Sequence, residues 1–128
     1  MNDELSRCVF LALCRHGEVE LAKSVAPEGD ADLGVRAIAE VAFGPAGPVE
    51  FLAWLQEKYR PEWSRDFTPA GVRILRNLYQ EHHDSALRWF IAQYGLGPEE
   101  GRALQSMWFS FGTDGERERQ RRVLSWFE

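Results

Sequence analysis

Two features recur along this chain at intervals of 29 to 37 residues. Arginines recur at spacings of 29, 37 and 29 residues, at Arg7, Arg36, Arg73 and Arg102. A Leu-x-Trp motif followed by an apolar residue recurs at spacings of 35 and 37 residues, with tryptophans at Trp54, Trp89 and Trp126. Recurrence at this interval is typical of repeat proteins, in which each unit packs on its neighbours. The sequence therefore predicts an array of repeats.

Each interval carries the signals of two helices. Gly47-Pro48, Thr68-Pro69 and Gly97-Pro98 suit the first turn of a helix. Asp32 and Asp84 are expected to cap two further helices, and Gly17 and Gly95 stand where helices would end. No stretch alternates apolar and polar residues over the length of a strand. We expect an all-α single domain, residues 1–128, without significant β-sheet.

The repeat interval divides the expected helices into pairs. About eight short helices would form four stacked helical hairpins. The hairpins are expected at about residues 3–31, 32–67, 68–97 and 98–128.

Three segments resemble parts of an ankyrin repeat. Residues 13–23, with His16-Gly17 at the centre, resemble the helix, glycine turn and helix of one unit. Residues 54–59 resemble the end of its outer helix, and residues 95–102 resemble the connection to the next unit. No unit carries the family's Thr-Pro-Leu-His turn. The resemblance implies hairpins stacked as an ankyrin-like solenoid.

Composition and charge exclude several classes of protein. Apolar residues make up 45% of the chain and charged residues 27%, as in ordinary globular proteins. The longest apolar run, Cys8 to Cys14, is too short to cross a bilayer. The acidic start, Met1 to Glu4, is unlike a secretory signal, so a cytoplasmic protein is expected. The formal charge of -5 makes nucleic acid an unlikely main ligand.

The sequence offers little for catalysis or metal binding. Glu81-His82-His83-Asp84 is the densest ionisable cluster, but consecutive turn residues diverge and His16 belongs to another unit. Cys8 and Cys14 are expected to be reduced core residues, in which burial suppresses the thiolate. We therefore expect a protein that is not an enzyme and has no metal or cofactor.

The recurring residues have a structural and a functional interpretation. The arginines are expected to bind loop carbonyls or carboxylates between repeats, and the tryptophans to be buried between neighbouring repeats. Exposed tryptophans would instead form a binding row, with Trp126 the most exposed. The charged run 116–122 is expected to be a solvated helix face with a Glu118–Arg122 pair, or a docking patch.

These observations favour a protein–protein interaction module. One version is a small inhibitor, immunity or antitoxin-type protein that binds a basic partner. A homodimer through the C-terminal hairpin is also expected, because the end at Trp126-Phe127 is apolar. The residues expected to bind a partner are Arg15, His16, Glu40, Glu81, His82, His83, Arg117, Arg121 and Trp126.

Two alternatives remain open. A compact helical bundle could be an enzyme or a ligand-binding protein that uses His82 and His83. A nucleic-acid accessory subunit could use the C-terminal arginines, Arg117 and Arg121 among them.

Overall fold

A computed structural model of the chain describes residues 3–44, 49–63, 68–106 and 114–128. The described residues form eight α-helices and no strand, which confirms the all-α prediction. The helices are α1 (Asp3–Arg15), α2 (Val19–Val25), α3 (Ala31–Phe43), α4 (Val49–Tyr59), α5 (Thr68–Gln80), α6 (Asp84–Gln93), α7 (Pro98–Gln105) and α8 (Asp114–Ser125). None of them combines the length and apolar character that a membrane-spanning helix requires.

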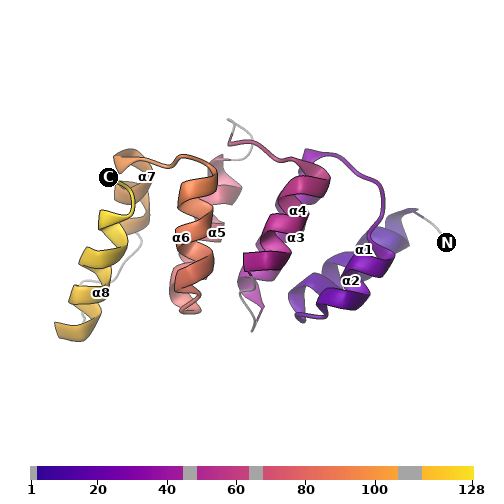
Figure 1. Cartoon of the computed structure of the whole chain (residues 1–128), viewed down its shortest axis with the longest axis horizontal. Helices are drawn as coiled ribbons and strands as arrows, with labels where there is room; N and C mark the ends of the chain where they lie inside the picture. The colour runs from indigo at the N-terminus through magenta and orange to yellow at the C-terminus, as the bar shows by residue number, and fades with distance from the viewer. Residues whose placement is uncertain (1–2, 45–48, 64–67, 107–113) are drawn as a thin grey trace.

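The helices form four hairpins that lie in a row (Figure 1). The α1–α2 hairpin lies at the right of the view and the α7–α8 hairpin at the left. The odd-numbered helices pack in succession, α1 on α3, α3 on α5 and α5 on α7. Each odd-numbered helix also packs on the helix that follows it, and α4 packs on α6. The hairpins therefore stack along one axis in two layers of helices.

The core lies between the two layers and runs through all four hairpins. Apolar residues spaced three and four apart fill the inner side of each helix, as Ile74 and Leu78 do in α5 and Leu87 and Ile91 do in α6. Phe10, Phe51 and Phe90 are fully buried and belong to the same cluster. The helices are thus held mainly by burial of one apolar stripe on each.

A glycine near the start of α3, α5 and α7 allows an aromatic side chain to pack against each helix. A Cβ on Gly34 would lie 2.6 Å from the Cβ of Tyr59. A Cβ on Gly71 would overlap the ring of Trp63, and one on Gly101 would lie 3.1 Å from Phe127. Tyr59 and Phe127 come from the chain that follows the helix, so these two contacts close their hairpins. Trp63 comes from the connection before α5, so its contact joins that connection to α5.

The three recurring tryptophans are all half-buried and pack against the core. The Lys23 ammonium lies 5.9 Å from the ring centroid of Trp54, and the Arg88 guanidinium lies 5.7 Å from that of Trp126. In both pairs, a cation of one even-numbered helix covers a tryptophan that lies in the next even-numbered helix or directly after it. Trp89 makes an edge contact with Tyr94 of its own hairpin, at 6.4 Å between centroids.

Two details differ from the expectations. Cys8 is exposed and only Cys14 is buried, because Cys8 lies about 200° around α1 from the buried Phe10. Asp30, and not Asp32, caps α3, since its carboxylate accepts a hydrogen bond from the Leu33 amide at 3.3 Å.

Candidate interaction surface

The odd-numbered helices turn one side to the core and the opposite side to solvent. On α3 the core side carries Leu33, Ala37 and Val41, so Arg36 lies on the solvent side. Arg73 and Arg76 of α5 and Arg102 of α7 are also exposed. We call this surface the odd-helix face. It presents four arginines: Arg36, Arg73, Arg76 and Arg102.

The expectation that the recurring arginines join neighbouring repeats is wrong. Arg7, Arg36, Arg73 and Arg102 are all exposed. Arg36 pairs with Asp32 of its own helix at 3.2 Å, in a solvated i, i+4 pair of low stabilising value. Within the described chain, the side chains of Arg73 and Arg102 have no hydrogen-bonding partner. These arginines lie on the sides of their helices that face away from the core. This position explains why they do not join neighbouring repeats as expected.

An exposed aromatic residue lies at one edge of the odd-helix face. Phe43 is 52% exposed and ends α3, two helical turns after Arg36. The Arg15 guanidinium of α1 lies 5.4 Å from the ring centroid of Phe43, and its Nε lies 3.8 Å from a carboxylate oxygen of Glu40. The structure thus brings together Arg15 and Glu40, two of the residues expected to bind a partner. Phe43 was not predicted from the sequence as a binding residue. Its position two helical turns after Arg36 nevertheless indicates that it shares the solvent side of α3.

The turns within the hairpins lie along one edge of the row. His83 Nε2 lies 2.9 Å from the carbonyl oxygen of Gly44, which joins the α5–α6 turn to the end of α3. Gly44 in turn packs on the carbonyl of Arg15, where a Cβ would overlap the oxygen. The α1–α2 and α5–α6 turns both lie at the lower edge in Figure 1. We call this the turn edge.

The other turn residues expected to bind a partner are open to solvent. His16, Glu81 and His82 are exposed on the turn edge, whereas His83 is half-buried. His82 adopts a left-handed conformation, with φ of 58°, at the position where Gly17 stands in the first hairpin, with φ of 73°. The turn edge therefore presents polar side chains beside the Arg15–Phe43 pair.

The three expected residues on the last hairpin lie elsewhere. Arg117 and Arg121 are exposed on α8, and Trp126 follows that helix, at the opposite end of the row from α1. Trp126 and Arg88 line a groove of about 750 Å³ together with the α6–α7 connection. The residues expected to bind a partner therefore divide into one group on the turn edge and one on the last hairpin.

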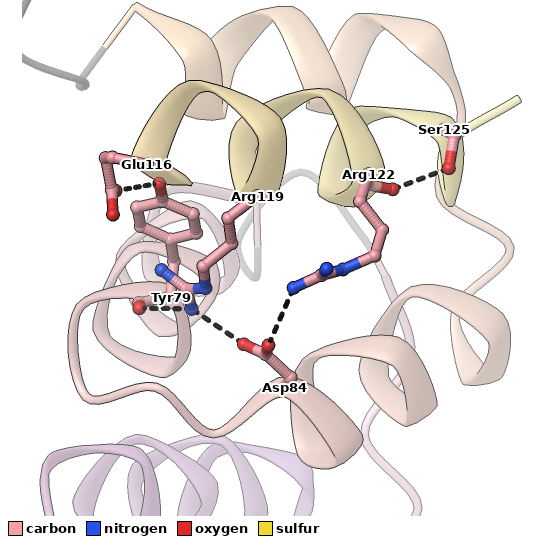
Figure 2. A network of polar contacts seen from close by, with 6 residues as sticks. All are labelled: Tyr79, Asp84, Glu116, Arg119, Arg122 and Ser125. Carbon is pink, nitrogen blue, oxygen red and sulfur yellow. Dashed lines mark hydrogen bonds and ion pairs between the residues drawn. The ribbon is translucent and has the colours of Figure 1, made fainter. Parts of the chain in front are cut away.

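A buried arginine holds the last hairpin on the third (Figure 2). Arg119 of α8 donates hydrogen bonds to the Tyr79 carbonyl at 2.8 Å and to the Asp84 carboxylate at 2.6 Å. Its guanidinium also lies 4.1 Å from the ring centroid of Tyr79. The Tyr79 hydroxyl donates a hydrogen bond to Glu116. We call these contacts the Arg119 clasp.

The clasp corrects two expectations. Asp84 does not cap α6 with its side chain, because its carboxylate turns to Arg119. Arg122 lies 3.8 Å from the same carboxylate, so Asp84 is its ion-pair partner and Glu118 is not. The hydrogen bond from Arg119 lowers the pKa of Asp84 below its ordinary value, and burial raises the pKa of Tyr79 to about 12. At neutral pH the Asp84 carboxyl is therefore ionised and the Tyr79 hydroxyl is protonated, and the clasp has a structural role.

The described residues offer few groups for chemistry. They contain no group of three histidine, cysteine, aspartate or glutamate side chains able to hold a metal. Burial, and to a lesser degree the charge of Glu40, raises the pKa of the Cys14 thiol to about 12, so this cysteine is not ionised at neutral pH. His16 and His82 lie in different hairpins, with the α3–α4 hairpin between them (Figure 1).

Comparisons with protein-family models, with curated proteins and with solved structures find no match to this chain. The resemblance to ankyrin repeats therefore stays a prediction.

Proposed function

We propose that this chain is a protein–protein interaction module whose partner docks on the odd-helix face beside the turn edge. The observation that carries the proposal is the Arg15–Phe43 pair, an exposed aromatic ring under a guanidinium at the edge of a row of exposed arginines. Aromatic residues and arginines are the residues on which binding energy concentrates at protein interfaces. A stack of hairpins offers an extended surface of this kind for recognition.

The charges on the odd-helix face indicate the chemistry of the partner. Arg73 and Arg102 lie exposed on successive odd-numbered helices, and each guanidinium can donate two hydrogen bonds to one carboxylate of a partner. A partner that docks here would present acidic side chains around an apolar residue that covers Phe43. Complementary charges of this kind speed association and fix the register of docking.

A second candidate uses the opposite layer. Glu20 of α2 and both Glu50 and Glu57 of α4 are exposed on the even-numbered helices. These carboxylates, together with the formal charge of -5, favour an inhibitor, immunity or antitoxin-type protein that binds a basic partner through this layer. The two candidates differ in the face used and in the sign of the partner's charge.

Charge-reversed variants of the two layers separate the candidates. Tagged wild type, an Arg73→Glu/Arg102→Glu variant and a Glu50→Lys/Glu57→Lys variant are used for affinity capture, with mass spectrometry to identify the partner. Binding is then measured with the purified partner. Both variants change only exposed charges and should fold like wild type, which circular dichroism checks.

We expect the arginine variant to lose binding and the glutamate variant to keep it. Phe43→Ala should weaken binding by about 2 kcal/mol, or about 30-fold. Loss of binding by the glutamate variant alone would favour the basic-partner candidate. Unchanged binding by both variants would exclude both layers. Capture of nucleic acid alone, with binding that falls steeply as salt is added, would overturn the protein-binding proposal.

A further inference from the structure

A groove of about 750 Å³ lies between the third and fourth hairpins. Its walls come from the later turns of α6, the α6–α7 connection with the start of α7, and the residues around the end of α8. In Figure 1 these segments lie at the upper left, on the edge of the row opposite the turn edge. None of the arginines of the odd-helix face lines the groove, and neither does Phe43. The groove is therefore separate from the surface assigned to a partner above.

Apolar residues make up most of the lining of this groove. Ile91, Leu96 and Phe127 are buried core residues that also line it, and Trp126 is half-buried beside them. On the α6–α7 connection, a Cβ added to Gly95 would meet no atom within 4 Å. The groove is therefore open at this point and can admit an apolar side chain of another molecule.

The positive charge at the groove belongs to Arg88. Its guanidinium lies 5.7 Å from the ring centroid of Trp126. Asp84 precedes Arg88 by four residues on α6, a spacing that suits an ion pair, but its carboxylate contacts Arg119 at 2.6 Å and Arg122 at 3.8 Å. Within the described residues, the Arg88 side chain has no hydrogen bond or ion pair. The Arg119 clasp thus leaves the charge of Arg88 without a carboxylate.

This arrangement prepares Arg88 to bind a carboxylate. A guanidinium over an aromatic ring is attracted by the ring and keeps its N–H groups available, so it can still donate two hydrogen bonds to one carboxylate. Glu128 is the one acidic residue that lines the groove, and it makes no ion pair with Arg88 in the described structure. Its charge directs the carboxylate of a ligand to Arg88.

Charge and shape together indicate the occupant. A site for a small molecule encloses most of its ligand, whereas this groove is open to solvent. An open groove with an arginine and a tryptophan on its walls suits a segment of another protein, because binding energy concentrates on such residues. We propose that the groove docks a short linear segment of a partner protein. An acidic residue of the segment contacts Arg88, and an adjacent apolar residue covers Trp126.

This docking site does not depend on the odd-helix face. A segment can enter the groove whether or not a partner occupies the opposite layer of helices. The contact area of such a segment is small, so its dissociation constant should lie in the micromolar range.

Selection from a library of short random peptides displayed on phage tests the proposal. The full chain serves as bait, and the selected peptides are synthesised for titration against the purified protein. We expect peptides that carry an aspartate or glutamate next to an apolar residue. Arg88→Gln should weaken their binding by about tenfold or more, and replacing the acidic residue of the peptide by its amide should weaken binding by a similar factor.

Two further variants complete the test. Arg73→Gln removes an exposed guanidinium outside the groove and is the matched control, so groove-binding peptides should bind it like wild type. Ala92→Glu places a carboxylate on an exposed residue that lines the groove and should abolish their binding. Circular dichroism checks that each variant is folded.

Three outcomes would overturn the proposal. In the first, no selected peptide loses affinity for the Arg88→Gln variant. In the second, the peptides that depend on Arg88 bind equally well after their acidic residue is replaced by its amide. In the third, sedimentation shows a wild-type dimer that Arg88→Gln makes monomeric, because a second copy of the chain would then occupy the groove.

Discussion

The Arg119 clasp supports a quantitative prediction about the last hairpin. Asp84→Asn keeps the size of the side chain but removes the negative charge that Arg119 contacts at 2.6 Å. The Arg119 side chain is only 10% exposed, so its charge would lose its counter-ion in a largely dry site. Breaking a fully buried ion pair in this way costs about 3 to 5 kcal/mol.

Two features of the site reduce that figure. The Asp84 side chain is 37% exposed, so water screens the pair, and Arg119 keeps the Tyr79 carbonyl and ring as partners. We expect a loss of about 2 kcal/mol in the free energy of unfolding. For a chain of this length, that loss lowers the midpoint of thermal unfolding by about 8 °C.

Arg122→Ala is the matched control for this variant. It removes the contact of 3.8 Å that Arg122 makes with the same carboxylate, but both side chains of that pair are solvated. The expected loss is below about 0.5 kcal/mol. Urea unfolding of the three proteins measures the difference, and amide hydrogen exchange in α8 shows whether the loss is local. Equal stabilities of the two variants would refute the assignment of Arg119 as the residue that holds the last hairpin.

Three further predictions follow from the same structure. The folded state lowers the pKa of Asp84 below 3.8, so the stability difference between wild type and Asp84→Asn should be constant at neutral pH and shrink as the pH falls below about 4. A difference that does not change in acid, in urea titrations at several pH values, would contradict this. Gly44→Ala should cost about 2 kcal/mol or more, since its Cβ would overlap the Arg15 carbonyl; an unchanged midpoint of urea unfolding would show that the turn edge can shift. A thiol reagent should modify Cys8 alone in the native protein and Cys14 only after unfolding, because Cys14 is buried and its pKa is raised to about 12. Mass spectrometry counts the modified thiols, and rapid labelling of both in the native protein would contradict the structure.

The number of helices and most of their ends could be predicted because their signals are local. Gly97-Pro98 begins α7 as expected, with Gly97 as its cap, and Gly95 follows α6 with φ of 59°. Signals of this kind depend on a few neighbouring residues and on backbone geometry alone. These helix ends could therefore be predicted without knowing which helices pack against each other.

The candidate surface was harder to predict, because it depends on which side of each helix faces the core. Arg119 stands in a charged run that was interpreted as solvated, yet it is buried. Its spacing of four and eight residues from Val123 and Phe127, both buried, was a signal that it shares their side of α8. The partner of Arg119 lies 35 residues away, and no local pattern could have identified it.

The stacking of the hairpins has a consequence for how the chain reaches its native state. The packing joins helices that are close in sequence, as in α1 with α2 and α3 with α4, or that belong to adjacent hairpins. Chains with such short-range topology close small loops first and fold quickly. The two central hairpins are covered on both sides, so order should begin there and spread outward to α2 and α8, which would be the first segments to fray.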